Sequence, residues 1–498
     1  MKVLARRDRV TCRRDMGLRT CFVSAEVAPL AKTGGLADVS AALPAALREL
    51  GHDVRVFMPF YRSIDRERFR AVPVEFIRDV PLGLGPRTFS VYVTELPDSG
   101  LPIYLIDCPE LYDRDGIYTS DPDEGLRFAG LSRATTVCCQ QMGWGPDVFH
   151  CNDWHAALLP LYLRTRARWD GLFARARTVL TIHNVGYQGV FGADLLPALD
   201  LTEYADLFFQ PDLAAGAINF LKTGVLYSDL LTTVSPNHAR EIQTPELGMG
   251  LDDLLRLRSD HLVGILNGID TREWDPATDP LLPHRYSARD LTGKKANRAA
   301  LLADLGLAPD PAGPVFGLVS RLVRQKGIEL VADALPGLVS GNDCRVALLG
   351  SGDPGLEEAL TRVEGRFPGR VSFFRGYSNE LAHRIEAGAD VFLMPSIYEP
   401  CGLNQMYSQR YGTPPIVRRT GGLADSVEHF DRATGRGTGF VFDHPTGYGL
   451  GWAIGEALAA WAEPEAWKRL MANGMARDFS WKKQALRYVE LYERLVAR

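Results

Sequence analysis

The sequence predicts an α/β protein of two domains, each built around a parallel sheet. Short apolar runs rich in β-branched residues alternate with helix-like stretches along the chain, which is typical of buried parallel strands. The chain has 498 residues, more than a single hydrophobic core usually serves. An octapeptide that begins at Lys32 has a near copy that begins at Arg419, one in each half. The predicted strands are residues 20–24, 54–58, 103–106, 148–150, 178–182 and 231–234, followed by 315–319, 345–349, 371–374, 391–394 and 415–417.

A segment rich in Pro, Asp and Arg, residues 270–314, separates the two series of strands. Its apolar periodicity is weak before a helix-like stretch at 294–305, so we place the domain boundary near its start. The tail at 481–496 predicts a helix that packs on the protein's own core, with a partner-binding helix as the alternative. The apolar residues at helical spacing in this tail are Trp481, Ala485, Tyr488, Tyr492 and Leu495. The predicted domains are an N-terminal extension at 1–19, a first domain at 20–268, a second domain at 269–478 and a C-terminal helix at 479–498.

Composition excludes several classes of function. The net charge of −5 argues against a broad basic surface for nucleic acid. Eight cysteines lie without a regular framework, so we expect neither a disulfide scaffold nor a metal site, and a reducing compartment such as the cytoplasm fits best. Residues 1–19 contain several arginines but no continuous apolar run, so they predict neither a signal peptide nor a membrane anchor. Met16 is an alternative start.

The repeated octapeptide has the features of an anion-binding loop. Lys32 precedes the glycine pair Gly34 and Gly35, and a helix start is predicted directly after it. Exposed backbone N–H groups and the helix dipole favour negative charge at such a place. Each loop alone is better explained as a turn before a helix, but the matched pair predicts two nucleotide-binding domains that face each other across a cleft. The second copy places the same residue types at Thr420, Gly421 and Gly422.

Polar residues follow several predicted strands, where open α/β sheets bind their ligands. Arg321 and Lys326 follow the strand at 315–319 and place two cations near each other, which suits a diphosphate leaving group. A solvent-exposed basic loop is the alternative. The acidic or imidazole side chains after three other strands are either helix-capping groups or ligands for sugar hydroxyls and developing positive charge. They are Asp153, His183 and Glu399.

Three other motifs predict function more weakly. Residues 350–355 match the glycine pattern of a dinucleotide-binding turn, but no carboxylate follows the next strand until Glu380, so we interpret the pattern as a structural turn. Tyr377, after that strand, is better placed to stack on a base. The Asp-x-Asp triplet at 113–115 is compatible with a metal-dependent sugar-nucleotide site but is short enough to arise by chance. The cluster at 150–155 lacks the histidine spacing of a zinc site.

With these motifs assembled, the chain resembles the bacterial glycogen synthase and plant starch synthase family from Thr20 to Arg498. The resemblance implies the GT-B architecture: two Rossmann-like domains, an active site between them, and a C-terminal helix that crosses back to the first domain. It also implies transfer of glucose from ADP-glucose to the non-reducing end of an α-1,4-glucan such as glycogen, with retention at the anomeric carbon and without a metal or other cofactor. The motifs are KTGGL at 32–36, NDWH at 152–155, TIHN at 181–184, SR and QKG within 320–327, EPCGL at 399–403, RTGGL at 419–423 and FSW at 479–481.

Carried over by position, the resemblance assigns roles to the candidate residues. The residues expected at the ADP diphosphate are Lys32, the backbone of Gly34 and Gly35, Arg321 and Lys326. Those expected around the glucose are His183, Glu399 and Asp153, which complete the predicted catalytic set with Arg321 and Lys326. The remaining donor-binding set is Asn267, Tyr377 as the adenine-stacking residue, Cys401, Gly402, Leu403, Asn404, Thr420, Gly421 and Gly422. Thr33 and Asn404 differ from the residues that other family members often have at these positions. We expect these differences to affect how the donor fits and to leave the reaction unchanged.

Other functions stay open at this point. A related transferase that uses UDP-glucose or builds another glycan would share the same scaffold. A sugar-nucleotide epimerase, a non-catalytic glucan-binding protein and, because of residues 350–355, a dehydrogenase are more distant alternatives.

Overall fold

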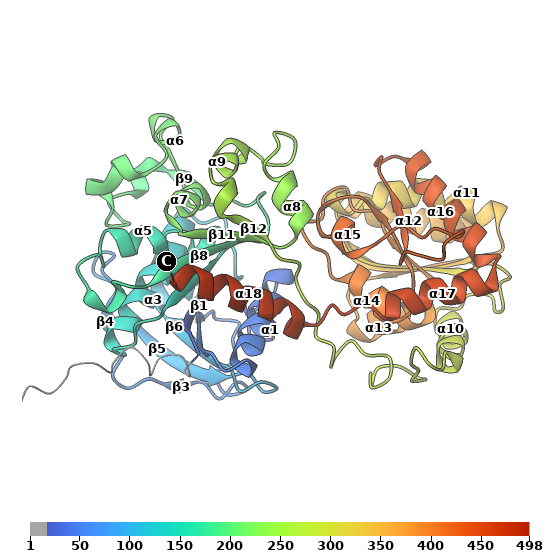
Figure 1. Cartoon of the computed structure of the whole chain (residues 1–498), viewed down its shortest axis with the longest axis horizontal. Coiled ribbons are helices and arrows are strands. Elements are labelled where there is room, and N and C mark those ends of the chain that lie inside the picture. Colours follow the sequence, from blue (N-terminus) through green and yellow to red (C-terminus); the bar gives the residue numbers. More distant parts are fainter. Residues whose placement is uncertain (1–16, 498) are drawn as a thin grey trace, which may run out of the picture. The chain divides into compact units, whose positions relative to one another are not determined.

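The computed structural model describes residues 17–497. Residues 1–16, which hold most of the N-terminal extension predicted at 1–19 and the alternative start Met16, lie outside that range, as does Arg498. The described chain forms two compact units, coloured along the sequence in Figure 1. Unit 1 comprises residues 17–233, 241–265 and 484–497, and unit 2 comprises Val234–Arg240 and Leu266–Lys483.

Unit 1 is built on a mixed sheet of ten strands within the described residues. The strand order is β12-β11-β8-β7-β1-β2-β6-β5-β3, with β4 paired to β5. The strands from β12 to β6 in this order are parallel, and β3, β4 and β5 form an antiparallel edge. A separate antiparallel pair joins β9 and β10. The strands are β1 (Arg19–Val23), β2 (Asp53–Pro59), β3 (Val72–Pro73), β4 (Val80–Pro81), β5 (Thr88–Glu95), β6 (Pro102–Asp107), β7 (Val148–Asn152), β8 (Arg177–Ile182), β9 (Val190–Gly192), β10 (Ala217–Asn219), β11 (Leu230–Thr233) and β12 (Leu262–Gly264).

The helices of unit 1 include the last helix of the chain, α18 (Trp481–Val496), whose residues from Gln484 onward belong to this unit. It confirms the helix predicted at 481–496, and all five residues of its predicted apolar stripe are buried. The other helices are α1 (Gly35–Glu49), α2 (Pro109–Tyr112), α3 (Glu124–Gln141), α4 (Asp153–Ala156), α5 (Leu159–Arg164), α6 (Gln210–Ala214), α7 (Phe220–Tyr227) and α9 (Asp252–Leu257), while α8 (Pro236–Glu241) lies almost wholly in unit 2.

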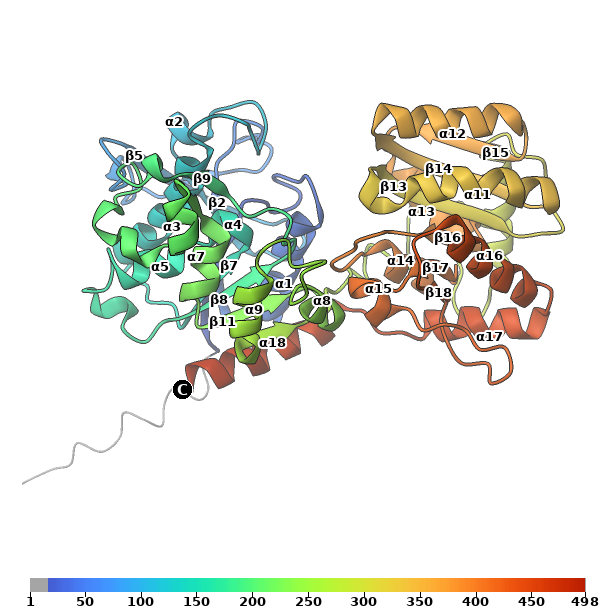
Figure 2. The same cartoon turned by 90° about the horizontal axis from the view of Figure 1, so that it is seen from above.

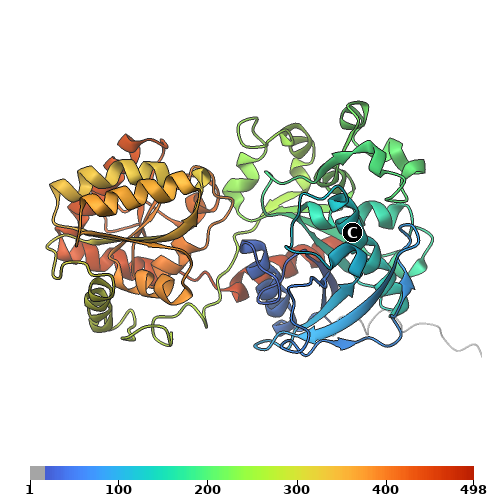
Figure 3. The same ribbon diagram turned by 180° about the vertical axis from the view of Figure 1, so that it is seen from behind.

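Unit 2 contains a parallel sheet of six strands among its described residues, in the order β15-β14-β13-β16-β17-β18. Figure 2 looks onto α11 and α12, and Figure 3 shows the same sheet edge-on with helices on both sides. Val315 and Phe316 pack into hydrophobic clusters on opposite faces, as alternation along a strand requires. The elements are β13 (Val315–Leu322), β14 (Arg345–Gly352), β15 (Val371–Arg375), β16 (Val391–Met394), β17 (Pro415–Arg418), β18 (Phe440–Phe442), α10 (Thr292–Asp304), α11 (Ile328–Gly341), α12 (Pro354–Arg366), α13 (Asn379–Gly388), α14 (Asn404–Arg410), α15 (Gly421–Ser426), α16 (Gly447–Trp461) and α17 (Pro464–Met475).

Every predicted strand overlaps a strand of the structure, and α10 confirms the helix predicted at 294–305. The antiparallel edge, the antiparallel pair of β9 and β10, and the short parallel strands β12 and β18 were missed. Strand β5 alternates buried and exposed residues, so it lacks the continuous apolar run by which the parallel strands were identified. Strand β18 has only three residues, which is too short for a periodic signal.

The Pro- and Asp-rich segment that was predicted to connect the domains is held in unit 2 by buried polar contacts. Asp279 is fully buried, accepts a hydrogen bond from the Tyr411 hydroxyl (2.6 Å) and contacts His383 Nδ1 (2.8 Å). Trp274 stacks on His383 and on Tyr407, with ring centroids 3.8 Å apart in both pairs. Specific side chains, not a regular apolar period, therefore order this segment.

The site residues predicted from the sequence lie at or after the ends of β1, β7, β8 and β12 in unit 1 and of β13, β15, β16 and β17 in unit 2. These are the carboxyl ends of parallel strands, where the following helices begin and ligands bind in open α/β sheets. No helix among residues 17–497 is both long and apolar enough to cross a membrane.

Candidate active site

The first glycine-rich loop connects β1 to α1 in unit 1. Gly34 and Gly35 stand at the start of α1, where the first N–H groups of a helix lack intrahelical partners. The fold itself does not require glycine here: Gly34 has extended backbone (φ −156°), and a Cβ on either glycine would meet no other described atom within 4 Å. Lys32 is exposed and its Nζ lies 2.6 Å from Asp38 Oδ1. The loop therefore offers open space beside a cation and a helix N-terminus, as an anion site needs.

A carboxylate that the sequence analysis overlooked organises this loop. Glu26, buried just after β1, accepts hydrogen bonds from the Thr33 N–H (2.5 Å), the Thr33 hydroxyl (2.6 Å) and the Gly34 N–H (3.2 Å). The Tyr118 hydroxyl donates to it as well, at 2.5 Å. The Gly34 N–H predicted to bind a diphosphate is therefore already engaged, which leaves the N-terminus of α1 from Gly35 onward. The position of Glu26 beyond a strand end is the signal that would have identified it.

The ends of β7 and β8 bring Asn152, Asp153 and His183 together. Asp153 Oδ1 accepts the backbone N–H of His183 (2.7 Å), and Asn152 Oδ1 lies 2.9 Å from His183 Nε2. Asn152 Nδ2 donates to the carbonyl of Val23 (3.0 Å), which fixes the amide orientation, so Nε2 of His183 carries the proton. Burial lowers the pKa of His183 to about 3, so its ring is neutral at pH 7 and Nδ1 is unprotonated.

Asp153 itself combines backbone strain with a shifted pKa. Its φ of +53° lies in the left-handed region, which a non-glycine residue adopts only where surrounding contacts enforce it. Burial raises the pKa of Asp153 to about 7, although the N–H groups of His183 and Asn184 act in the opposite direction. Strain of this kind and a carboxyl that titrates near neutrality are both concentrated at functional sites.

In unit 2 the predicted cation Lys326, which is partly buried, forms an ion pair with the predicted and buried carboxylate Glu399. Lys326 Nζ lies 2.5 Å from Glu399 Oε2, and the Ser396 hydroxyl donates to the same oxygen at 2.9 Å. The side chain of Glu399 is only 7% exposed. The hypothesis of a cationic clamp treated Lys326 as a free charge, whereas in the structure a ligand would share it with Glu399.

Backbone contacts fasten together the two loops that carry this pair. Gln325 Nε2 donates to the carbonyl of Tyr398 (2.9 Å), and the Ile397 N–H donates to the carbonyl of Gln325 (2.8 Å). Gly327 has a φ of +68°, and a Cβ there would collide with the carbonyl oxygen of Pro395. The relative position of Lys326 and Glu399 is thus fixed by the loops as well as by their own charges.

Two predicted donor-binding side chains project from strand ends into solvent. Arg321 is exposed and forms no ion pair with any described residue. Tyr377 is 81% exposed, with its hydroxyl 3.4 Å from Asn379 Oδ1. A guanidinium without an internal partner and a bare aromatic ring are suited to phosphate and to a nucleobase, respectively. Asn404, at the start of α14, instead donates to the carbonyl of Val319 (2.9 Å).

The second glycine-rich loop differs from the first in its contacts. A Cβ on Gly421 (φ +42°) would collide with the carbonyl oxygen of Glu399, and a Cβ on Gly422 with that of Cys401. The Gly422 N–H donates to the carbonyls of Glu399 (3.2 Å) and Pro400 (3.0 Å). The interpretation of the two loops as equivalent is therefore wrong for their glycines, because here the protein's own backbone fills the space that is open in front of Gly35.

Two predicted donor-binding residues contain buried polar atoms without a hydrogen-bond partner among the described residues, Thr420 Oγ1 and Asn267 Oδ1. Buried polar groups are normally satisfied, so these atoms are candidates for ligand or water contacts. Asn267 lies against Cys401, whose sulfur accepts its backbone N–H. Burial raises the pKa of the Cys401 thiol to about 12, so Cys401 is a neutral wall of the site. Gly402 (φ +74°) and Leu403 continue this turn into α14.

The weaker sequence motifs are explained by the fold. Asp113 and Asp115 both pair with Arg62, at 2.6 and 3.0 Å. Among residues 17–497, no group of three or more His, Cys, Asp or Glu is arranged to hold a metal ion. Gly350 and Gly352 are needed where β14 runs beside β13, since a Cβ on either would collide with the backbone of β13. The pattern at 350–355 is thus a structural turn, as interpreted.

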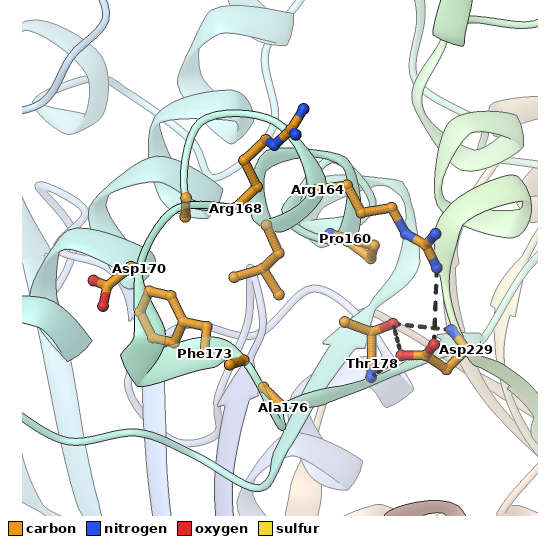
Figure 4. A pocket seen from close by; sticks show the side chains of 11 residues that line it. Pro160, Arg164, Arg168, Asp170, Phe173, Ala176, Thr178 and Asp229 are labelled. Atoms are coloured by element: carbon orange, nitrogen blue, oxygen red, sulfur yellow. Dashed lines mark hydrogen bonds and ion pairs between the residues drawn. The ribbon is translucent and has the colours of Figure 1, made fainter. Parts of the chain in front are cut away.

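A cavity of about 180 Å³ opens in unit 1 near the start of β8 (Figure 4). Three of its polar residues contact each other: Asp229 accepts the N–H and the hydroxyl of Thr178, both at 2.8 Å, and Arg164 lies 3.8 Å from Asp229. Thr178 is at the amino end of β8, whereas His183 follows the carboxyl end. The cavity is therefore separate from the candidate site.

Comparison with known proteins finds relatives along the whole chain. Residues 19–257 match the family model of the starch synthase catalytic domain, and residues 307–471 match glycosyl transferases group 1. A glycogen synthase of Anaeromyxobacter dehalogenans is 47% identical over 492 residues, which cover 96% of this chain and 99% of the relative. A glycogen synthase of Rhodospirillum rubrum is 43% identical over 491 residues, with 96% and 99% covered.

Solved structures with the same fold include the catalytic domain of starch synthase IV from Arabidopsis thaliana, bound to ADP and acarbose. It is 35% identical, with a TM-score of 0.89 over 97% of this chain and 100% of that chain. Sucrose-phosphate synthase from Thermosynechococcus elongatus shares the fold at 20% identity, with a TM-score of 0.61 over 96% of this chain and 99% of that chain.

Alanine at Gly35 and at Gly422 is expected to separate binding from folding. Gly35→Ala adds a methyl group to open space, so the melting temperature should stay unchanged while the dissociation constant for ADP rises. Gly422→Ala drives a methyl group into the turn of Glu399, so the melting temperature should fall. Calorimetry and ADP titration measure both effects. Equal losses of stability in the two variants would contradict the distinction between the loops.

The stability of an Asp153→Asn variant relative to the parent protein is expected to increase with pH. The folded pKa near 7 exceeds the ordinary value, so the folded state retains a proton that the unfolded state has lost between about pH 4 and 7. Stability of the parent protein therefore decreases through that window, by on the order of a few kcal/mol at most, while asparagine does not titrate. Melting curves of both proteins from pH 5 to 8 test this, and a constant difference between them would refute the raised pKa.

Proposed function

We propose that this chain, which belongs to the glycogen and starch synthase family, transfers glucose from ADP-glucose to the non-reducing 4-hydroxyl of an α-1,4-glucan such as glycogen. Membership follows from the relatives at 42–47% identity over nearly the whole chain, and the α/β fold with two parallel-sheet units is of the GT-B type. The observation that carries the proposal is the ion pair of Lys326 with the buried Glu399, together with Arg321, five residues before Lys326, which forms no ion pair with any described residue.

The residues of unit 2 support binding of the donor. Arg321 and Lys326 supply positive charge for the diphosphate, and the exposed ring of Tyr377 is suited to stack on adenine. Thr420 Oγ1 and Asn267 Oδ1 have unused hydrogen-bonding capacity for the donor. Cys401, Gly402, Leu403 and Asn404 form the adjoining wall.

The residues of unit 1 support a role in the same reaction. Lys32 and the N-terminus of α1 from Gly35 onward favour the negative charge of the diphosphate. The carboxyl of Asp153 and the neutral ring of His183 are polar groups at strand ends that suit the hydroxyls of glucose. Both roles come from the resemblance by position.

The proposed reaction is a front-face displacement with retention. The bond between C1 of glucose and the diphosphate oxygen breaks, the acceptor O4 bonds to C1 on the same face, and the departing diphosphate oxygen takes the proton of the 4-hydroxyl. Arg321 and Lys326 neutralise the charge that develops on the diphosphate, the task that a metal ion performs elsewhere. The carboxylate of Glu399 and the backbone at His183 stabilise positive charge at C1. ADP and a glucan longer by one residue are the products.

We place the enzyme in the cytoplasm. The described cysteines, Cys21, Cys108, Cys138, Cys139, Cys151, Cys344 and Cys401, are all free and buried, which supports a reducing compartment. Neither nucleic acid nor a membrane is needed as a partner.

Incubation with radiolabelled ADP-glucose and glycogen tests the reaction. Label should enter glycogen in α-1,4 links that an amylase specific for that linkage releases, with less incorporation from UDP-glucose. Greater incorporation from UDP-glucose would correct the donor, and a changed sugar nucleotide without added glucan would favour an epimerase. The absence of any conversion would favour a non-catalytic glucan-binding protein.

Arg321→Ala is expected to reduce kcat by about 10²- to 10³-fold with little change in melting temperature, because an exposed charge that would stabilise the leaving group is lost. Arg362→Ala, which removes an exposed arginine from α12, is the matched control and should keep full activity. Lys326→Ala removes the other cation proposed at the diphosphate. Its effect is harder to interpret, because the substitution also leaves Glu399 buried without its partner. Near-normal turnover of Arg321→Ala would exclude the proposed role in leaving-group stabilisation.

A further inference from the structure

A chain of buried hydrogen bonds joins the last helix of the protein to the central strands of unit 1. The Tyr492 hydroxyl on α18 lies 2.5 Å from Nδ1 of His150, and Nε2 of His150 lies 2.5 Å from the Thr181 hydroxyl. The Thr181 hydroxyl lies 2.6 Å from that of Thr232. All four residues are at most 1% exposed. We call this chain the Tyr492 relay.

The relay lies directly before the candidate site residues along two neighbouring strands. His150 precedes Asn152 by two residues on β7, and Thr181 precedes His183 by two residues on β8. Side chains two residues apart on a strand share a face of the sheet. The pair Asn152 and His183, 2.9 Å apart, therefore lies two residues further toward the carboxyl ends of the strands than the pair His150 and Thr181.

The two histidines also influence each other electrostatically. Burial and, to a smaller extent, the charge of His183 lower the pKa of His150 to about 3. Both rings are therefore neutral, and each must have one nitrogen that donates and one that accepts. The partner at Nδ1 of His150 is Tyr492, so the tautomer and the tilt of that ring depend on a hydroxyl supplied by α18.

The fold alone does not explain a polar chain at this place. Buried polar groups contribute little net stability over apolar side chains of similar size, but they fix one arrangement when all their partners are present. The surroundings are apolar and aromatic: Phe22 lies against His150 with centroids 4.7 Å apart, and Tyr488 lies 5.7 Å away.

We propose that Tyr492 is a positioning residue for the glucosyl transfer, acting through His150 and Thr181 on the strand ends that hold Asn152, Asp153 and His183. The inference rests on the proposed function, in which Asp153 and His183 surround the glucose. The hydroxyl of Tyr492 orients His150, and His150 holds β7 and β8 in the register at which the Asn152 amide meets the His183 ring.

Tyr492→Phe tests the relay, because it removes one hydroxyl and keeps the packing of the ring. We expect kcat to fall by about 5- to 20-fold, short of the roughly 10²-fold that a 1 Å misplacement can cost, with KM for ADP-glucose changed less than about twofold. The matched control is Tyr162→Phe, which removes the hydroxyl of another fully buried tyrosine in unit 1, bonded to the carbonyl of Leu199 at 2.9 Å. A similar loss of kcat in both variants would show a general effect of core disruption and overturn the proposal.

Nitrogen NMR of the histidine rings supplies a readout that needs no activity. Tyr492→Phe should shift the ring nitrogens of both His150 and His183, and Tyr162→Phe should shift neither. A shift confined to His150 would overturn the proposal even if the chain proved inactive with ADP-glucose, whereas failure of the proposed function would appear as an inactive parent protein with the coupled shifts intact.

Thr181→Val tests the relay from its other end and replaces Tyr492→Phe if that variant does not fold. It should shift the same ring nitrogens and lower kcat to a similar extent. In a protein that carries both substitutions, kcat should fall no further than in the more affected single variant, because both remove one chain of contacts. Losses that multiply would show two independent effects and would refute the relay.

Discussion

The ion pair of Lys326 and Glu399 is the interaction on which the unit 2 part of the site depends. Removing two charges from water costs several kcal/mol for each ion, and their attraction compensates only if the geometry is good and further hydrogen bonds are made. Ser396 supplies one such bond, and Gln325 ties the two loops together. The glycines at 327, 421 and 422 are the residues that allow the backbone segments around this pair to approach so closely. Much of the local sequence therefore serves to bury one pair of charges.

The two similar octapeptides have different surroundings in the structure, so their sequence similarity does not by itself establish similar roles. The first copy faces open space and is organised by Glu26, whereas the second is packed against the turn of Glu399. The same glycine pair therefore leaves room beside a helix N-terminus in one unit and admits a neighbouring backbone in the other. Residues outside the octapeptides, Glu26 in one case and Cys401 in the other, make the difference.

The sequence was sufficient to predict the longer parallel strands, the last helix and most polar groups at the strand ends, because each has a local signal; the three-residue parallel strands β12 and β18 have none. It did not reveal the antiparallel edge, whose half-exposed strands have no continuous apolar run. It also missed Glu26, whose partners at Thr33 and Gly34 depend on how the chain folds back over β1. The pairing of Lys326 with Glu399 joins residues 73 positions apart, which spacing alone cannot reveal.

Unit 1 is discontinuous in the chain, since its last helix comes after all of unit 2. During synthesis on a ribosome, the face of β7 and β8 that receives Tyr492 lacks the cover of α18 until that helix emerges. Unit 1 therefore reaches its complete core only after unit 2 has been synthesised. A transcript truncated by even a few dozen codons would yield a protein whose N-terminal unit lacks part of its own interior.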